Sequence, residues 1–450
     1  MASSGLCTKG CRSNRRRLSG GEISAAQFDV IVVGAGLAGL SAAYTLAKAG
    51  QSVLVIERGS VAGSKNVSGG RIYTYALEKL EPGLAASAPL ERAVTHEQIM
   101  MLDGERAVTI EYSDPETLKG SPQSYTVLRA VFDEWFAAQV EAQGAFVAAG
   151  VHVNDLLIED DRIVGVIAGE DEMRARVVIA ADGVNALLSQ KAGLRPDLTP
   201  HEIGVGVKEV IELPAATIES RFHIGADEGA ARMILGGSRG VNGGAFLYTN
   251  RSSLSLGCVF LPGPLAEKGI AIHDLFQEIK MHPAIYPLIE GGRTVEYGAH
   301  LVPEAGWKHV PQPLYRSGFL VVGDAAGLVI NQGYTIRGMD LAVLSGLAAA
   351  NAVLATADDA AATGPAYVSQ LEELGLATAM RQFAGFPGLM DNPRLFSVSP
   401  ALAADMFRTL YTVDEAVGPP LRQGLWHTVR QNTSLRDLIK DGWAVARALK

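Results

Sequence analysis

Cysteine is scarce in this sequence, and its scarcity limits the chemistry that the chain can perform. The 450 residues include three cysteines, Cys7, Cys11 and Cys258. Three thiols do not form a disulfide framework, and so low a number is typical of a reducing compartment. Cys7 and Cys11 supply at most half of a tetrahedral metal site, because no further cysteine or nearby histidine completes it. We therefore expect a cytoplasmic protein, with no metal site.

Long apolar runs and positive charge are also lacking. No apolar run of roughly 18 residues is free of glycine or charge, so we expect no membrane span. The formal net charge of −9 argues against a nucleic-acid binder, whose phosphate contacts need clustered lysine and arginine. The one basic run, Arg15–Arg17, lies in a polar N-terminal stretch. Residues 1–27 lack the apolar region and cleavage site of an export signal, which indicates an unstructured tail.

A catalytic constellation is missing as well. The nine histidines are scattered, and the sequence shows no Ser-His-Asp set and no paired cysteines. The catalytic residues are therefore unknown at this stage. This absence agrees with a reaction whose chemistry a bound cofactor supplies.

Glycine, by contrast, is abundant, and its most informative cluster opens a nucleotide-binding unit. Val30–Val33 is a short apolar run that predicts a buried parallel strand. Gly34, Gly36 and Gly39 follow as G-x-G-x-x-G. The first allows a tight turn, the second lets the backbone approach a pyrophosphate, and the third lets a helix pack close to the strand. The free N–H groups at the start of that helix favour an anion.

A second strand, Val53–Ile56, ends in Glu57 at the distance from the glycines where a carboxylate accepts a ribose hydroxyl. The next stretch, residues 63–71, is rich in glycine and serine. It is compatible with a loop lying against the cofactor and equally with an ordinary turn-rich loop.

The middle of the chain adds weaker signals. Residues 127–143 predict an amphipathic helix with Val131, Trp135, Phe136 and Val140 on one face. Arg129, near its start, is either a surface charge or a ligand contact. The strand predicted at 177–181 runs into Asp182 and Gly183, which form either a simple turn or a carboxylate near the ligand.

The architecture is expected to change after residue 203. Residues 204–261 alternate apolar and polar positions between glycine-rich turns, which predicts antiparallel strands. A parallel strand returns at 319–322 and ends in Gly323 and Asp324, and a helix follows from Met339 to about 354. Residues 364–450 look helical, with an apolar set that is either core or a patch for a membrane surface or partner: Phe383, Phe386, Leu389, Met390, Leu395, Phe396, Met406, Phe407 and Leu410.

These patterns predict an α/β protein with a discontinuous Rossmann-like nucleotide-binding domain, an antiparallel-sheet second domain and a helical C-terminal region. The expected boundaries are a tail at 1–27, a nucleotide-binding domain at 28–200 that closes with 316–360, a second domain at 201–315 and the helical region at 361–450.

Taken together, the motifs resemble those of the glutathione-reductase-type FAD fold, and within it the electron-transfer flavoprotein:quinone oxidoreductases with their FixC-like subunits. The segments that carry the resemblance are GAGLAG at 34–39 with Glu57, GSKNVSGG at 63–70, Ala181–Gly183, GGAFLYTN at 243–250, Lys280–Pro283, VGDAAG at 322–327 and GYTIRGMD at 333–340.

The resemblance implies FAD as the cofactor and a role for each matching position. The pyrophosphate would lie on Gly34, Ala35, Gly36, Leu37, Ala38 and Gly39. The adenosine half would contact Glu57 with Arg58, Arg129 and the backbone near Val153. Asp182, Gly183, Gly323 and Asp324 would line the FAD, and the isoalloxazine ring would lie beside Ser68, Gly69, Gly70, Gly338 and Met339.

The resemblance also implies the partners. An electron-transfer flavoprotein would donate electrons, and a quinone or other small hydrophobic acceptor would take them. Larger relatives hold an iron–sulfur cluster on four cysteines near the C-terminus, a region without cysteine here. A cluster would therefore reside on a separate ferredoxin-like protein.

Two alternatives stay open. One is an FAD-dependent monooxygenase or reductase, similar to the geranylgeranyl reductases, acting on a small hydrophobic substrate. The other is an electron-relay subunit without turnover of its own. The aromatic Y-x-W-x-F segment of the geranylgeranyl reductases is absent where GGAFLYTN stands, and no second nicotinamide-type glycine motif is evident.

Overall fold

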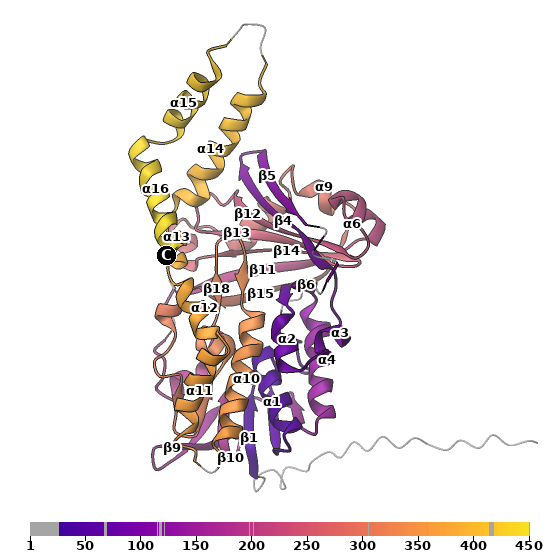
Figure 1. Ribbon diagram of the computed structural model, residues 1–450, viewed down its shortest axis with the longest axis vertical. Coiled ribbons are helices and arrows are strands. Elements are labelled where there is room, and N and C mark those ends of the chain that lie inside the picture. Colours follow the sequence, from indigo (N-terminus) through magenta and orange to yellow (C-terminus); the bar gives the residue numbers. More distant parts are fainter. Residues whose placement is uncertain are drawn as a thin grey trace, which may run out of the picture.

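The computed structural model describes residues 27–66, 70–114, 116, 119–120, 122–197, 199–200, 202–304, 306–357, 359–413 and 418–449. The expected tail at 1–27, with Cys7, Cys11 and Arg15–Arg17, lies almost wholly outside them. In Figure 1 the described chain forms three tiers: a lower sheet, helices above it with a second sheet beyond them, and the projecting C-terminal helices at the top.

The lower sheet is built on the expected nucleotide-binding unit. Its parallel core has the order β17-β10-β1-β2-β7, and Val30–Val33 of β1 are buried on both faces, as the apolar run predicts. The described strands of this sheet are β1 (Gln27–Val33), β2 (Val53–Glu57), β7 (Phe146–Ala149), β8 (Asp155–Glu159), β9 (Arg162–Ala168), β10 (Asp171–Ala180), β16 (Tyr315–Arg316) and β17 (Phe319–Val321).

The second sheet lies above the first and is mostly antiparallel, as expected, with the order β15-β11-β14-β13-β12-β4-β6-β3 and β5 paired to β4. One pair differs from the expectation, because β4 and β12 run parallel. Its described strands are β3 (Gly70–Tyr73), β4 (Ala93–Asp103), β5 (Arg106–Ser113), β6 (Ser124–Val127), β11 (Ile203–Glu212), β12 (Glu228–Gly236), β13 (Gly243–Thr249), β14 (Ser253–Phe260) and β15 (Arg293–Pro303).

Four strands of the second sheet come from residues 70–127, well before the expected boundary at residue 200. The chain therefore enters the upper sheet early, returns to the lower sheet with β7 to β10, and leaves again with β11. The chain therefore passes between the two sheets more often than the predicted domain limits imply. Strand pairing within one sheet joins segments that are more than a hundred residues apart in the sequence.

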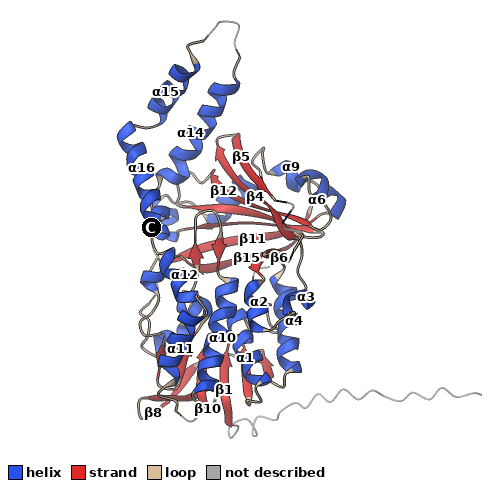
Figure 2. Cartoon of the chain, viewed as in Figure 1, coloured by secondary structure: helices blue, strands red, loops and turns tan. Residues whose placement is uncertain are grey.

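Helices lie between and beside the two sheets in the view of Figure 2. Helix α1 packs against α10 so closely that a Cβ on Gly346 would lie 2.1 Å from the carbonyl oxygen of Ala38. The described α-helices are α1 (Leu37–Lys48), α2 (Tyr75–Leu80), α3 (Leu84–Ser87), α4 (Arg129–Ala142), α5 (Leu187–Lys191), α6 (Ala215–Phe222), α7 (Pro262–Glu267), α8 (Ile272–Lys280), α9 (Tyr286–Ile289), α10 (Met339–Ala355), α11 (Thr363–Glu373), α12 (Leu376–Gln382), α13 (Phe386–Met390), α14 (Arg394–Tyr411), α15 (Leu421–Asn432) and α16 (Leu435–Ala448).

The buried face of α4 differs from the expected one. Phe132, Phe136 and Val140 are fully buried, whereas Val131 is 53% exposed. The apolar stripe is therefore the i, i+4, i+8 row from residue 132, and residue 131 lies about 100° around the helix from it. Asp133 joins the buried face because Arg129 pairs with it.

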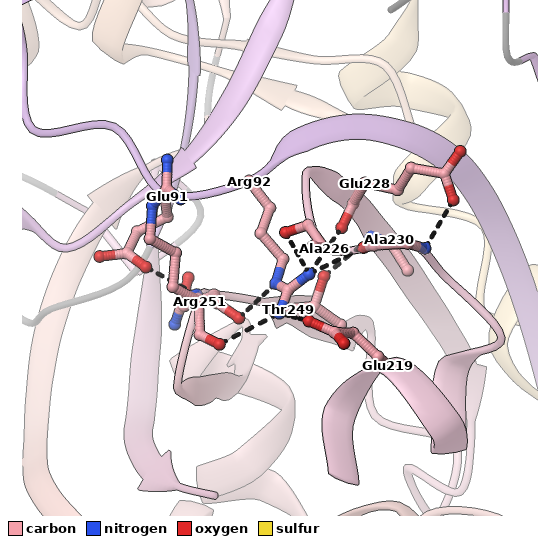
Figure 3. Close-up of polar contacts among 10 residues, drawn as sticks. Glu91, Arg92, Glu219, Ala226, Glu228, Ala230, Thr249 and Arg251 are labelled. Carbon is pink, nitrogen blue, oxygen red and sulfur yellow. Dashed lines mark hydrogen bonds and ion pairs between the residues drawn. The ribbon is translucent and has the colours of Figure 1, made fainter. Parts of the chain in front are cut away.

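A buried arginine, Arg92, links the start of β4 to three segments that are distant in the sequence (Figure 3). The Arg92 guanidinium donates to the carbonyl oxygens of Gly225, Ala226, Glu228, Asn250 and Arg251 and to the Glu219 carboxylate, at 2.8–3.3 Å. These contacts join the start of β4 to the loop before β12 and the turn between β13 and β14. Its role is structural.

Candidate functional site

The turn between β1 and α1 has the geometry that the glycine motif predicts. Gly34 has φ +108°, and a Cβ there would lie 2.2 Å from the carbonyl oxygen of Ala181. Gly39 is equally confined, with its Cβ position 2.0 Å from the carbonyl oxygen of Gly34. At Gly36, by contrast, a Cβ would meet no described atom within 4 Å. The middle glycine therefore faces open space at the start of α1, where a pyrophosphate would lie.

Glu57 ends β2 beside this turn. Its Oε2 accepts a hydrogen bond from the backbone N–H of Ala35 at 2.9 Å, and its Oε1 accepts one from Gly59. Both bonds fix the carboxylate against the glycine turn. Because a carboxylate offers about four acceptor positions, capacity for a ribose hydroxyl remains.

Arg129 is not a surface charge. Its Nε and Nη2 donate to the two carboxylate oxygens of Asp133, each at 2.8 Å, and the Asp133 side chain is fully buried. Asn66 also donates to Asp133. The sequence analysis missed Asp133, although an arginine and an aspartate four residues apart on one helix face are a recognisable signal.

Two acidic residues, Asp182 and Asp324, lie just after the ends of β10 and β17 in the lower sheet. Burial raises the pKa of Asp324, and the nearby Arg129 guanidinium acts in the opposite direction. Burial also raises the pKa of Asp182, whose Oδ2 accepts from the backbone N–H of Leu188. The Asp182 Oδ1 is buried and has no hydrogen-bond partner in the described part of the chain.

A cavity of about 440 Å³, here called the inner cavity, brings these groups together between the two sheets. Most of the expected cofactor residues line it: Gly34, Gly36, Leu37, Ala38, Glu57, Arg58, Gly70, Arg129, Val153, Asp182, Gly183, Asp324, Gly338 and Met339.

The other expected residues lie elsewhere. Ala35, Gly39 and Gly323 are not among the lining residues. The N–H of Ala35 donates to Glu57, which lines the cavity. A Cβ on Gly323 would lie 2.8 Å from the Cβ of Ala38, another lining residue, so Ala35 and Gly323 position lining residues without lining the cavity themselves. Ser68 and Gly69 lie outside the described residues.

The upper sheet contributes a wall that the sequence analysis did not predict, formed by Lys208 on β11, His300 on β15 and Glu304 just beyond it. Burial lowers the pKa of Lys208 to about 8, and Arg129 adds to the effect. Burial, Lys208 and Arg129 together lower the pKa of His300. Burial raises the pKa of Glu304 to about 7, although Asn331 donates to it at 2.9 Å. The sequence around each of these residues carries no local signal of a site. The pairing of β11 with β15 brings the three residues together.

The inner cavity fits an FAD. The open position at Gly36 and the N–H groups at the start of α1 suit a pyrophosphate, and the unpartnered Asp182 oxygen suits a hydroxyl donor. The described residues contain no group of three or more His, Cys, Asp or Glu side chains arranged to hold a metal ion.

Comparisons with known proteins agree with this geometry. Residues 29–201 match the family model for FAD dependent oxidoreductases, and residues 386–450 match the C-terminal domain of the ETF-QO/FixC family.

Some relatives match almost the whole of this chain. It is 45% identical to the "Probable electron transfer flavoprotein-quinone oxidoreductase YdiS" of Escherichia coli, over 94% of this chain and 99% of the relative. It is 44% identical to "Protein FixC" of Escherichia coli, over 92% of this chain and 97% of the relative.

Among solved structures, the fold is shared with a geranylgeranyl bacteriochlorophyll reductase-like protein from Thermoplasma acidophilum. The TM-score is 0.69 at 20% identity, and the match covers 92% of this chain and 98% of that chain. The fold is also shared with PqsL, a probable FAD-dependent monooxygenase from Pseudomonas aeruginosa, with a TM-score of 0.57 at 14% identity over 82% and 98% of the two chains.

The fold, the glycine turn and the inner cavity define an FAD-dependent oxidoreductase. Within that class, the chain belongs to the electron transfer flavoprotein–quinone oxidoreductase and FixC family.

Proposed function

We propose that this protein accepts electrons from an electron-transfer flavoprotein and passes them through FAD to a quinone. The observation that carries the proposal is the identity of 45% with a relative named for this reaction, over 94% of this chain and 99% of that relative. FAD supplies the redox chemistry, since it takes up two electrons and releases them. The quinone gains two electrons and two protons and becomes a quinol.

The residues of the inner cavity have separate roles in this proposal. The N–H groups at the start of α1 would hold the pyrophosphate against Gly34–Gly39, Glu57 would accept a hydroxyl of the adenosine ribose, and Arg58, Arg129 and Val153 would flank the adenosine half. Asp182, Gly183 and Asp324 line the middle of the cofactor. Gly70, Gly338 and Met339 would lie beside the ring, and the family resemblance implies the same position for Ser68 and Gly69. The positive N-terminal end of α10, at Met339, would favour negative charge on a flavin ring bound beside it.

A separate ferredoxin-like protein is a second partner in the proposal. A four-iron cluster needs cysteine thiolates, and the sequence has no cysteine after Cys258. If a cluster takes part in the electron path, another polypeptide holds it.

The projecting C-terminal helices support peripheral contact with a membrane (Figure 1). On α16, Leu435, Ile439 and Trp443 follow one another at helical spacing, and each is more than half exposed. Basic side chains also outnumber acidic ones on these helices: Arg394, Arg408, Arg422, Arg430, Arg436, Lys440 and Arg447 against Asp405, Asp437 and Asp441. An apolar stripe with basic neighbours suits an anionic bilayer surface. In the part of the chain that the structure describes, no helix is both long and apolar enough to cross a bilayer.

Quinol formation tests the proposal. Purified protein loaded with FAD is mixed anaerobically with a reduced electron-transfer flavoprotein and a short-chain quinone, with and without a ferredoxin-like partner. We expect quinol to form only when donor, protein and quinone are all present. Quinol formation driven by NADH alone favours the reductase alternative, and stable association without any turnover favours a relay subunit.

A further inference from the structure

Asp133 is a fully buried carboxylate on α4 that does not itself line the inner cavity. Its two oxygens accept hydrogen bonds from Nε and Nη2 of Arg129, and Oδ2 also accepts one from the side-chain amide of Asn66. Arg129 and Asn66 both line the cavity, although they come from segments that are far apart in the sequence. Asp133 therefore lies directly behind two side chains of the cavity wall.

The pairing with Asp133 fixes the orientation of the Arg129 guanidinium. Nε and Nη2 share one edge of the planar group, and both donate to the carboxylate at 2.8 Å. Two of the five N–H groups are used in this way, which leaves at most three for a ligand in the cavity. A side-on pair of this kind sets both the position and the plane of the guanidinium. Without the carboxylate, the long side chain would regain other rotamers.

The turn formed by residues 63–66 lies against the same carboxylate. A Cβ on Gly63 would lie 2.8 Å from the Cβ of Asp133 and 3.1 Å from the carbonyl oxygen of Arg129, so the backbone of the turn contacts the first turns of α4. The N–H of Asn66 donates to the carbonyl oxygen of Gly63 at 2.9 Å and closes the turn. Gly63 and Asn66 both line the inner cavity. Asp133 thus joins this turn to Arg129.

Stability alone does not account for a carboxylate at this position. The cost of removing two charges from water offsets most of the attraction in a buried ion pair, and apolar side chains of similar volume often serve the fold equally well. A carboxylate differs from an apolar side chain in accepting hydrogen bonds from two directions at once. Here the donors are Arg129 and Asn66, and both reach the cavity.

We propose that Asp133 is a positioning residue for FAD. It holds Arg129 and the turn of residues 63–66 in the orientation in which they contact the cofactor, and the affinity for FAD depends on it. The inference rests on the cofactor placement in the proposed function, and it is independent of the electron donor and the acceptor.

Titration of FAD into the full-length apoprotein tests this role, with the dissociation constant taken from the change in flavin fluorescence. Asp133→Asn removes the charge and keeps the shape. We expect FAD to bind about tenfold more weakly, which is the scale of one charge-assisted hydrogen bond that is no longer held in place. Glu134→Gln, the same change of charge at the exposed next position of α4, is the matched control and should bind as the unchanged protein does.

A structural role and a positioning role give different results. Circular dichroism of each apoprotein gives its folded fraction. If Asp133→Asn is less stable but binds FAD with an unchanged dissociation constant per folded chain, the role is purely structural and the proposal is wrong.

A second comparison tests whether Asp133 acts through its two partners. In the variant Asn66→Ala/Arg129→Met, adding Asp133→Asn should change the dissociation constant by less than about twofold, because both groups that it positions are already gone. A further tenfold loss in that background would contradict the proposal.

Arg129→Lys carries the test if Asp133→Asn does not fold. It keeps the positive charge and cannot form the planar side-on pair, so we expect binding about tenfold weaker than that of the unchanged protein. Unchanged binding would show that the orientation of the group does not matter, and the proposal would fail while the proposed function stands. If the unchanged apoprotein does not bind FAD, the cofactor placement fails, and the proposed function and this inference fail with it.

Discussion

At the scale of single residues, the three glycines of the motif differ in what requires them. The fold requires Gly34 and Gly39, whereas only the proposed ligand requires Gly36. Gly34 and Gly39 are confined by backbone atoms, whereas Gly36 has extended backbone angles, φ −88° and ψ 179°, and open space at its Cβ position. A side chain at Gly36 is therefore compatible with the turn and would occupy the space proposed for the pyrophosphate.

We predict that Gly36→Val folds and loses bound FAD. Flavin absorbance per chain should fall at least tenfold, because the valine methyl groups displace the phosphate from the N–H groups of α1. Gly442→Val on α16, where a Cβ also meets no described atom within 4 Å, is the matched control and should retain its flavin. Full flavin content in Gly36→Val would place the pyrophosphate elsewhere.

Glu304 gives a prediction about pH. Burial raises its pKa from 4.5 to about 7, so between these values the folded protein holds a proton that the unfolded chain has lost. The free energy of unfolding therefore decreases as the pH rises through this window, and it is independent of this group below and above it.

Glu304→Gln keeps an acceptor for Asn331 and removes the ionisation. Its stability relative to the unchanged protein should increase by about 1–3 kcal/mol between about pH 5 and pH 8 in urea unfolding. Glu172→Gln, at an exposed position, should show no such trend. A pH-independent difference for Glu304→Gln would show that the carboxyl is not buried in the folded protein.

At the scale of elements, Arg92 links the start of β4 to α6, to the loop before β12 and to the turn between β13 and β14. Arg92→Met would remove a buried guanidinium and its hydrogen bonds to five backbone carbonyl groups, and would leave Glu219 without its ion-pair partner. We expect a loss of about 3–5 kcal/mol in the free energy of unfolding, measured by urea denaturation.

Arg174→Met is the control for Arg92→Met. It breaks an exposed ion pair with Glu159 and should cost about 0.5 kcal/mol or less. Equal losses in the two variants would contradict the structural role assigned to Arg92.

The elements also show how far the sequence alone could predict this molecule. The strands β1 and β2 and the helix α10 were predicted close to their observed bounds, because glycine spacing and apolar periodicity are local signals. The strands of residues 70–127 were not assigned to the upper sheet, since β4 pairs in parallel with β12, some 130 residues later.

In the candidate site, too, some residues were predicted from the sequence and others were not. Gly34, Gly36 and Glu57 were predicted from local patterns and Asp324 from the family resemblance, and all four line one cavity. Lys208, His300 and Glu304 were missed because they reach that cavity only through the packing of the second sheet over the first.

At the scale of the whole molecule, the C-terminal helices form a surface distinct from the two sheets (Figure 1). If they contact a membrane, the double variant Ile439→Ser/Trp443→Ser should sediment much less with vesicles of phosphatidylcholine and phosphatidylglycerol. We expect at least a tenfold loss of binding, because two exposed apolar side chains of one stripe are removed.

Tyr297→Ser, on β15, is the control and should bind vesicles as the unchanged protein does. Undiminished binding of the double variant would exclude this stripe as the membrane contact.

The central claim, that electrons pass from an electron-transfer flavoprotein through FAD to a quinone, is tested most directly by anaerobic sequential mixing that follows the flavin absorbance. FAD-loaded protein is mixed first with a reduced electron-transfer flavoprotein and then with menadione. The account predicts bleaching of the flavin band in the first step, its return in the second, and no bleaching when NADH replaces the flavoprotein. A flavin that NADH bleaches, and that the reduced flavoprotein leaves oxidised, would contradict it.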